Sequence, residues 1–311
     1  MAIRSANPPL VLIAGPTASG KSALALALAE RVSGVVINAD SAQVYRELPI
    51  LSAGPTAEDY ARAEHRLYGF QDGALPCSAA DWAARARTAI ADVHAQGRTP
   101  ILVGGTGLYI RTLLDGIAPV PEIDPAIRQA IREAPTEENR RRLAEVDPGA
   151  SAKLKPADKA RIARALEVVV STGKPLAEWQ KDRTGGIANE IDLSPLVLLP
   201  PREWLYRRCD ERFSSMIGKG ARQEVQALLA RNLDPRLPVM RAIGVREIAS
   251  FLRGDASIDE AVAAGQQATR RYAKRQYTWF AHQPPAEWRR FHEPVDAAAF
   301  PRALELVETE A

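Results

Sequence analysis

Residues 15–22 form a motif that could bind a phosphate group. They read GPTASGKS and match the pattern Gly-x4-Gly-Lys-Ser/Thr, in which backbone N–H groups surround an anion at the start of a helix. Lys21 adds a positive charge, and the Ser22 hydroxyl is a possible ligand for Mg²⁺. The motif predicts a diphosphate or triphosphate ligand and does not by itself select ATP. The residues that would hold the ligand are Gly15, Pro16, Thr17, Ala18, Ser19, Gly20, Lys21 and Ser22.

The chain lacks the residues that would assign this loop to a GTPase or to an ATPase motor. It has no Asn-Lys-x-Asp run to specify guanine, and the strand predicted at 101–103 is followed by GGTG rather than by acidic residues. A carboxylate, Asp40, instead follows the strand predicted at 35–37. At the carboxyl edge of a parallel sheet, Asp40 could be a metal ligand of an ordinary phosphotransferase or a general base.

The elements that must position these residues form an α/β pattern. Strand-like apolar runs at 10–14, 35–37 and 101–103 alternate with helical patterns at 22–32 and 79–96. This alternation is typical of a parallel sheet with helices on both faces. We therefore predict an α/β fold with a P-loop NTPase-like parallel sheet flanked by helices.

The pattern changes after Gly116, which predicts a separate helical segment. Residues 124–170 are almost wholly helical in pattern, a strand returns at 196–199, and helices dominate from Trp204 onward. We expect an inserted all-helical domain. The predicted bounds are 1–117 and 191–311 for the catalytic core with its C-terminal helices, and 118–190 for the insertion.

Composition fits an ordinary globular protein rather than a membrane or disulfide-rich one. The chain has 311 residues, 25% of them charged, and a net charge of only +3 at pH 7, so total charge does not require a nucleic-acid partner. No apolar run approaches the roughly 18 residues of a membrane helix, and no signal peptide is predicted. Two cysteines and four scattered histidines predict neither a disulfide framework nor a zinc site. We expect a cytoplasmic protein without membrane contact.

Six further stretches, taken with GPTASGKS, give the chain a family resemblance. In order and spacing they closely resemble the bacterial tRNA dimethylallyltransferases, also called tRNA isopentenyltransferases, over nearly the whole chain. They are NADSAQVYR at 38–46, VGGTGLYIR at 103–111, RALEV at 164–168, PREWLYRRCDERFSSM at 201–216, RAIGVRE at 241–247 and QATRRYAKRQYTWF at 267–280. Two stretches depart from the family pattern: PILSAGPT at 49–56, where Gly54 replaces a lysine, and HRLYGFQD at 65–72.

The resemblance implies a prenyl transfer to tRNA. A dimethylallyl group would move from dimethylallyl diphosphate to N6 of the adenosine 3′-adjacent to the anticodon, in tRNAs that read codons beginning with U. The P-loop would hold the diphosphate leaving group with Mg²⁺ as cofactor, and no energy nucleotide would be consumed. The implied partners are the anticodon stem-loop of tRNA and dimethylallyl diphosphate. Nothing in the sequence requires a dimer, so we expect a monomer.

The resemblance also implies three catalytic residues, each with a structural alternative. Asp40 matches the family's catalytic aspartate, which would accept a proton from the adenine amine; the alternative is a helix cap before Ser41. Thr106 matches a threonine near the reacting atoms; the alternative is a turn hydroxyl bonded to its own backbone. Arg212 matches an arginine that grips the diphosphate; the alternative is a surface ion pair. The acids available for that pair are Glu203, Asp210 and Glu211.

One predicted helix carries a basic face suited to an RNA backbone. Residues 261–286 include no acid, although solvated charged faces normally mix both signs. At helical spacing the cations of this segment share one broad face, which suits phosphate contacts. They are Arg270, Arg271, Lys274 and Arg275.

The resemblance implies that the insertion at 118–190 contacts tRNA, and it places further tRNA contacts on shorter stretches. These are Asp40, Ser41, Ala42 and Gln43; Thr106 and Arg128; Ala160, Arg161, Ile162, Ala163 and Arg164; and the predicted loop Arg241, Ala242, Ile243, Gly244, Val245 and Arg246. By contrast, Trp82, Trp179 and Trp204 lie in helical patterns, and we predict core positions for them rather than base stacking.

Two other functions share parts of this pattern. A small-molecule or nucleotide kinase would have the P-loop and Asp40 but would need a lid that binds ATP. A non-enzymatic RNA-binding protein could keep the P-loop as a remnant. The intact Lys21–Ser22 pair argues against a remnant, and AKRQYTW at 273–279 argues against a kinase. For a prenyltransferase we expect ATP to compete weakly with the prenyl donor without being a substrate.

Overall fold

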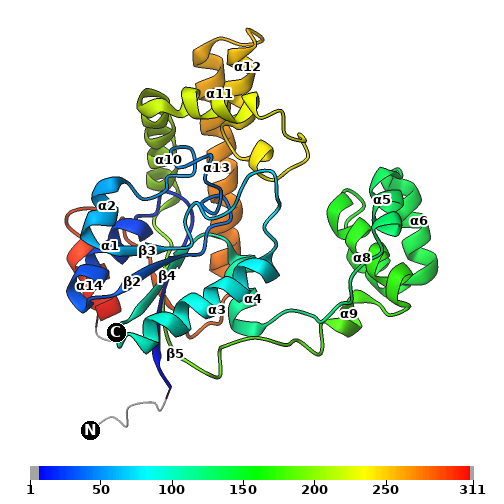
Figure 1. Ribbon diagram of the computed structural model, residues 1–311, viewed down its shortest axis with the longest axis horizontal. Coiled ribbons are helices and arrows are strands. Elements are labelled where there is room, and N and C mark those ends of the chain that lie inside the picture. The colour runs from blue at the N-terminus through cyan, green and yellow to red at the C-terminus, as the bar shows by residue number, and fades with distance from the viewer. Residues whose placement is uncertain (1–6, 309–311) are drawn as a thin grey trace. The chain divides into compact units, whose positions relative to one another are not determined.

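The computed structural model describes residues 7–308, and its centre is a six-stranded sheet (Figure 1). The strands run in the order β3-β2-β4-β1-β5-β6, and every neighbouring pair is parallel. Their bounds are Pro9–Ala14 for β1, Val35–Asn38 for β2, Glu64–Arg66 for β3, Pro100–Gly104 for β4, Asp192–Leu198 for β5 and Arg289–Phe291 for β6. The predicted fold class is confirmed.

Helices on both faces bury the middle of the sheet. α1 (Lys21–Val32) and α14 (Phe300–Glu308) pack together and share one apolar cluster with β1, β4 and β5. α3 (Ala79–Ala95) contacts β2 and β4. Because β1 and β4 are covered on both sides, they are continuous apolar runs without polar alternation, and this is why the sequence predicts them.

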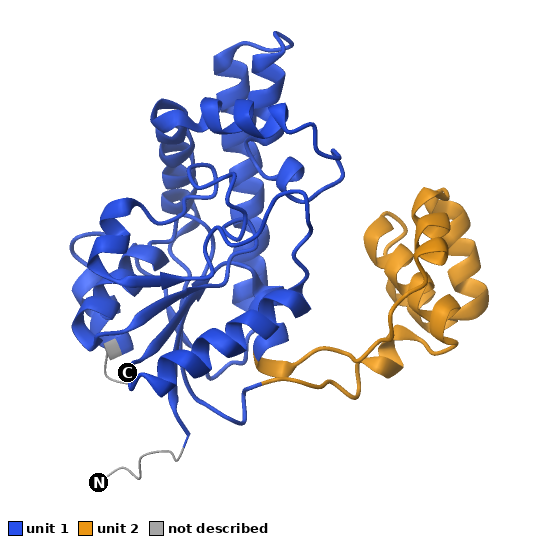
Figure 2. Cartoon of the chain, viewed as in Figure 1, with its two compact units in different colours: residues 1–113, 187–311 blue, residues 114–186 orange. Residues whose placement is uncertain are grey.

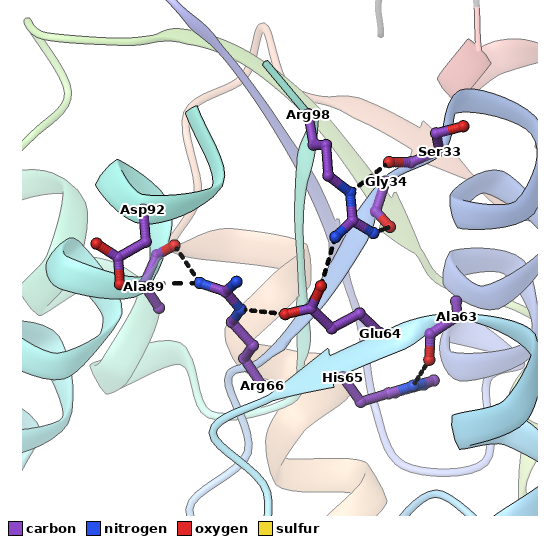
Figure 3. A network of polar contacts seen from close by, with 9 residues as sticks. All are labelled: Ser33, Gly34, Ala63, Glu64, His65, Arg66, Ala89, Asp92 and Arg98. Atoms are coloured by element: carbon purple, nitrogen blue, oxygen red, sulfur yellow. Dashed lines mark hydrogen bonds and ion pairs between the residues drawn. The ribbon is translucent and has the colours of Figure 1, made fainter. Parts of the chain in front are cut away.

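The two edge strands are not predicted from the sequence, because each has three residues and carries charge. Figure 3 shows how β3 is stabilised. Arg98 donates to the carbonyls of Ser33 at 3.0 Å and Gly34 at 2.9 Å, and it also pairs with Glu64. Arg66 binds the same carboxylate at 2.7 Å. The charged side chains of β3 therefore pair with charged residues of the same chain. Charged residues on an edge strand also discourage pairing with strands of other molecules.

A further group of helices follows β5. α10 (Arg202–Met216) and the long α13 (Ile258–His282) pack side by side (Figure 1). Ser257 caps α13 and shares a reciprocal capping box with Glu260, a strong start signal for a helix of this length. The elements between α10 and α13 are the π turn η1 (Ile217–Ala221), α11 (Arg222–Ala230), the 3-10 turn η2 (Val239–Arg241) and α12 (Val245–Leu252). Two shorter helices precede them in the chain, α2 (Ala57–Arg62) and α4 (Gly107–Asp115).

Residues 114–186 form a second compact unit, and residues 1–113 with 187–311 form the first (Figure 2). The second unit has its own apolar cluster, which includes Ile131, Leu143 and Leu166. It starts at 114 rather than at the expected 118, and it ends at 186 rather than at 190. Its helices are α5 (Pro125–Glu133), α6 (Thr136–Val146), α7 (Pro148–Lys153), α8 (Lys159–Thr172) and α9 (Leu176–Trp179).

The chain leaves and re-enters the first unit at one place. The amide of Ile187 donates to the carbonyl of Leu113 at 3.0 Å, so the two ends of the insertion are adjacent. Within the described range 7–308, no helix is both long and apolar enough to cross a membrane. Cys77 and Cys209 are both free thiols, as the sequence predicts.

Candidate active site

The phosphate-binding loop joins β1 to α1 as the sequence predicts. Gly20 lies in the left-handed region at φ 99° and directly precedes Lys21, the first residue of α1. A Cβ on Gly20 would lie 2.8 Å from the side chain of Val295, so both conformation and space require glycine. Ala18 also has a positive φ, 65°. The loop thus presents its backbone N–H groups at the amino end of a helix, the geometry that binds anions.

Lys21 is buried, and its environment makes it a poorly solvated cation. Its Nζ donates to the carbonyl of Pro16 at 3.3 Å. Burial lowers the pKa of Lys21 from its ordinary value to about 8; the nearby Asp40 carboxylate opposes this shift, and the Arg212 guanidinium adds to it. A buried lysine and a half-buried arginine next to one carboxylate are stabilised by an anionic ligand, because the ligand restores charge balance.

Arg212 points at the phosphate loop from α10. One of its terminal nitrogens donates to the hydroxyl of Thr17, whereas its Nε is buried without a hydrogen-bond partner. Burial lowers its pKa. The alternative of a surface ion pair for Arg212 is wrong, because Asp210 pairs with Arg270 and Glu211 with Arg207.

Asp40 follows β2 in a tight turn. Its Oδ1 accepts from the amide of Ala42 at 3.0 Å, and its own amide donates to Asn38 Oδ1 at 2.8 Å. The side chain of Asn38 also donates to the carbonyls of Asp40 and Leu67. No helix begins at Ser41, so the helix-cap alternative is wrong. Asp40 is instead a buried carboxylate held by one oxygen at the carboxyl edge of the sheet.

Thr106 lies between β4 and α4 and is bound to the Asp40 turn. Its amide donates to the carbonyl of Ala39 at 3.2 Å, and its Oγ1 accepts from the amide of Ser41 at 2.9 Å. The same hydroxyl donates to Ser41 Oγ at 3.2 Å. The alternative of a hydroxyl bonded to its own backbone is therefore wrong. These bonds fix Asp40 and Thr106, distant in sequence, next to each other.

A cavity of about 320 Å³ lies beside these residues. Its polar wall includes Thr17, Asp40, Ser41 and Arg212. The rest of its lining is largely apolar or aromatic and comes from the turn after β2, α4, α10, η2 and α13. The apolar and aromatic residues that line the cavity include Tyr45, Leu48, Leu51, Tyr109, Phe213, Met216, Ile243 and Tyr272. Such a cavity suits a ligand with one charged end and one apolar or aromatic end.

Gln43 holds the stretch in which this chain departs from the family pattern. Its Nε2 donates to the carbonyls of Ser52 and Ala53 at 3.1 and 2.7 Å. From the other side, Glu224 accepts from the amides of Ile50 and Leu51 at 2.7 and 2.9 Å. The turn at 49–56 is therefore fixed by two side chains without the lysine that Gly54 replaces. Gln43 positions a wall of the cavity and does not line it.

The basic face of α13 is smaller than the sequence predicts. Arg270 is half-buried and pairs with Asp210 on α10, at 2.5 and 2.6 Å, so a neighbouring helix supplies the acid that this segment lacks. Arg275 is exposed, lies over the ring of Tyr272 and lines the cavity. Arg271 and Lys274 are exposed, and within residues 7–308 neither has an ion pair. These three cations are the ones available to an RNA backbone.

The segment 241–246 is only partly a loop. Arg241 ends η2, whereas Val245 and Arg246 form the first turn of α12. Val245 is 2% exposed, so its side chain cannot contact tRNA and this prediction is wrong for that residue. Arg241, Ala242 and Ile243 line the cavity, and Gly244 is the residue before α12 at φ 96°.

In the second unit, the predicted tRNA stretch lies on the first turns of α8. Ile162 is 1% exposed and belongs to the apolar cluster, so its side chain is not available to tRNA. Ala163 packs against the same cluster, whereas Ala160 and Arg161 are exposed. Arg161 pairs with Asp158 at 3.4 Å.

Glu167 organises the other cations of this unit. Its side chain is 1% exposed and accepts from Arg132 Nε at 2.8 Å, with Arg164 at 3.8 Å. Burial lowers the pKa of Arg164. Arg128 lies close enough to interact electrostatically with Arg164, and its Nε is buried without a hydrogen-bond partner. Arg132 and Glu167 are members of this cluster that the sequence did not single out.

The tryptophan predictions are correct for one residue of three. Trp82 is fully buried and donates to the carbonyl of Asn38 at 3.0 Å. Trp204 and Trp179 are half-buried, and each lies against a cation: Arg208 over Trp204 at 4.8 Å and Lys174 over Trp179 at 4.5 Å. A helical pattern cannot separate a core tryptophan from one at the edge of the core, because both face inward.

The fold and the site together define a P-loop α/β enzyme. The carboxylate beside its phosphate loop is Asp40, which follows β2, whereas residues 104–107, at the end of β4, read GGTG and include no acid that could orient water. The family model described as IPP transferase matches residues 43–283. The chain therefore belongs to the IPP transferase family of tRNA prenyltransferases. Family membership sets aside the kinase and the non-enzymatic RNA-binding alternatives.

Individual relatives agree with this assignment. The chain is 60% identical to the tRNA dimethylallyltransferase of Sphingopyxis alaskensis, over 96% of this chain and 99% of the relative. Among solved structures it is similar to the full-length tRNA isopentenylpyrophosphate transferase of Bacillus halodurans, with a TM-score of 0.69, 32% identity and coverage of 97% and 95%. It is also similar to a eukaryotic dimethylallyltransferase acting on tRNA, with a TM-score of 0.76, 28% identity and coverage of 88% of this chain and 69% of the other.

Proposed function

We propose that this protein transfers the dimethylallyl group of dimethylallyl diphosphate to N6 of the adenosine 3′-adjacent to the anticodon, in tRNAs that read codons beginning with U. One observation carries the proposal: Asp40 shares one cavity with Arg212 and with Thr17 of the phosphate loop. A diphosphate held by the loop would leave its allylic carbon in the cavity, within reach of a base that enters there.

The leaving group would be stabilised by residues already in place. As the C–O bond of the donor breaks, its electron pair stays with the diphosphate, whose negative charge grows. The backbone N–H groups of Ala18 and Gly20 and the side chains of Lys21 and Arg212 lie where that charge would develop. Preorganised donors of this kind are often the largest contribution to catalysis.

The nucleophile needs a proton acceptor, and Asp40 is the candidate. The lone pair of an exocyclic adenine amine is delocalised into the ring, so it attacks well only if its proton is removed as the new C–N bond forms. Asp40 would accept this proton, a role typically worth about 10²–10⁴-fold in rate. Thr106 fixes the turn that carries Asp40, through Ser41.

Magnesium would fit at the start of α1. Ser22 follows Lys21 directly and its side chain is exposed. Among residues 7–308 no cluster of three His, Cys, Asp or Glu side chains could hold a metal. A single hydroxyl donor such as that of Ser22 suits Mg²⁺, which takes few protein ligands and many phosphate and water oxygens. When bound, the ion would supply positive charge to the diphosphate oxygens.

We further propose that tRNA approaches over the exposed cations of α13 and of the insertion, and that the target adenine leaves its stack to enter the cavity, as other base-modifying enzymes require. We also propose a monomer as the working form. The two free thiols support a reducing compartment, and we keep the cytoplasm as the proposed location.

The proposal is tested by mass spectrometry of tRNA nucleosides after incubation of the protein with tRNA, dimethylallyl diphosphate and Mg²⁺. We expect one adenosine per reactive tRNA to gain C5H8, at the position after the anticodon. A tRNA in which that adenosine is replaced by guanosine serves as the control. A modification at another position, or on another base, would contradict the proposed target.

A further inference from the structure

The side chain of Gln276 joins two loops of the site that are far apart in sequence. It lies on α13, is 5% exposed, and uses both ends of its amide. Its Oε1 accepts from the backbone amide of Thr17 at 2.8 Å, in the phosphate loop. Its Nε2 donates to the carbonyl of Gly105 at 2.8 Å, in the loop that carries Thr106. The two bonds span 259 and 171 residues of sequence.

Two glycines of the GGTG segment make room for α13. A Cβ on Gly105 would collide with the Gln276 amide, and a Cβ on Gly107 would lie 2.5 Å from the ring of Trp279. The residues on both sides of Thr106 therefore pack directly against side chains of α13. This close packing leaves the position of the Thr106 backbone little freedom.

The phosphate loop is held at the same point. The amide of Thr17 binds Gln276, while its hydroxyl accepts from Arg212. Thr17 is therefore bound through its backbone to α13 and through its side chain to α10. Its backbone N–H is therefore not available to a phosphate. Thr17 instead anchors the phosphate loop to α13 and α10.

We propose that Gln276 is a positioning residue that sets the distance between the diphosphate site and the Asp40–Thr106 pair. The inference rests on the proposed prenyl transfer, in which the electrophile is held by the first loop and the proton acceptor by the second. A planar amide of fixed length that bridges both loops places the reacting atoms in register. Misplacement by about 1 Å can cost about 10² in rate.

Two variants separate this role from simple packing. Gln276→Met keeps the volume and removes both hydrogen bonds. Gln276→Glu is isosteric, and when neutral its carboxyl group still accepts from Thr17 and donates to Gly105. When ionised it cannot donate to Gly105, and it adds a negative charge beside the diphosphate site. Gln267→Met is the matched control, because Gln267 is exposed on the opposite side of the same helix.

The experiment measures single-turnover prenyl transfer, affinity for inorganic pyrophosphate and affinity for tRNA. We expect Gln276→Met to lose about 10² in rate and to bind pyrophosphate more weakly, with tRNA affinity unchanged. The rate of Gln276→Glu relative to wild type should rise as pH falls from about 8 to about 6, because burial favours the neutral acid. The relative rate of Gln276→Met should not change with pH.

Several outcomes would overturn the proposal. One is a Gln276→Met enzyme with the wild-type rate; another is a Gln276→Glu ratio that is flat with pH. A loss of tRNA affinity equal to the loss in rate would make Gln276 a packing residue of α13. If wild type itself transfers no prenyl group in the same assay, the proposed function fails instead, so the two failures are distinguishable.

Discussion

The two compact units differ in the balance of their buried charge. At the edge of the sheet, the first unit buries Lys21 and half-buries Arg212 next to the buried carboxylate of Asp40, so cations outnumber anions there. In the second unit the buried charges are the anions Asp147 and Glu167, and Arg132, the partner of Glu167, is 63% exposed. A site that buries cations gains charge balance from an anionic ligand. A site that buries an anion holds its cations at the surface. The first arrangement suits chemistry on a diphosphate, and the second suits docking of a polyanion.

This difference predicts two kinds of mutational effect. Changes at the buried charges beside the cavity of the first unit should reduce the rate of transfer strongly and depend little on salt, because buried charges are poorly screened. Changes at exposed cations should weaken tRNA binding modestly and depend strongly on salt.

The largest effect is expected for Lys21→Ala. It removes the buried cation nearest the phosphate loop, and transfer should fall by about 10³ or more, beyond measurement in a standard assay. Single-turnover rates with saturating tRNA check this. Lys219→Ala, at an exposed lysine of η1, is the control and should keep its rate. A Lys21→Ala enzyme with a rate within about tenfold of wild type would show that Lys21 does not stabilise the leaving diphosphate.

Asp40→Asn should lower kcat by about 10²–10⁴ and leave tRNA affinity nearly unchanged. The amide can still accept from Ala42 through the same oxygen, so the turn should keep its shape while the proton acceptor is removed. Parallel measurement of kcat and of tRNA Kd separates a loss of proton transfer from a loss of tRNA binding. Equal decreases in both would show that Asp40 is a docking residue.

Removal of residues 114–186 should separate docking from diphosphate binding. Leu113 and Ile187 are joined by a backbone hydrogen bond of 3.0 Å, so a short glycine linker can close the gap. We expect tRNA affinity to fall to the level supported by the cations of α13, whereas pyrophosphate affinity stays. Retention of full tRNA affinity would mean that the first unit alone binds the anticodon arm.

Pyrophosphate affinity should decrease as pH rises through about 8. Burial lowers the pKa of Lys21 to about 8, so the free enzyme loses this cation above that pH. A bound anion favours the charged form, so the pKa is higher in the complex and binding takes up a proton. Affinity should then fall by up to about tenfold per pH unit above 8. Calorimetry in two buffers of different ionisation enthalpy measures the proton uptake; its absence at about pH 9 would contradict a lysine that contacts the ligand.

The smallest effect is expected at the surface of α13. Replacing Arg271 and Lys274 by alanine should lower the slope of log K against log salt by about 0.7–0.9 for each RNA phosphate that is no longer neutralised. Filter binding over a range of salt concentrations measures it. Arg253→Ala, at an exposed arginine paired with Asp255, should leave the slope unchanged. An unchanged slope in the double variant would show that this face is only solvated.

Much of the fold was predictable because its signals are local. The runs at 10–14 and 101–103 are buried on both faces, and prolines at 135 and 148 fall at the breaks between insertion helices. The edge strands β3 and β6 were not predictable, because their stability depends on side chains elsewhere, such as Arg98 for β3. The order of the strands was not predicted either, because it depends on contacts between segments that lie far apart in sequence.

The site was predictable in its chemistry and less so in its contacts. The phosphate loop, Asp40 and Thr106 stand in motifs, and the structure brings them together. Pairing across helices could not be predicted: Asp210 neutralises Arg270, which the sequence of α13 alone presents as part of a basic face. Ile162 shows the same limit, since a motif carried over residue by residue includes positions that face the core.

In the proposed reaction the phosphate loop holds a leaving diphosphate and no nucleotide is consumed. The most direct test is the stoichiometry of a reaction that contains only protein, tRNA, dimethylallyl diphosphate and Mg²⁺, with release of pyrophosphate and prenyl transfer to tRNA measured together. We expect one pyrophosphate per prenyl group transferred, at a rate that added ATP does not increase. A strict requirement for ATP, or its conversion to ADP in step with transfer, would contradict the proposal.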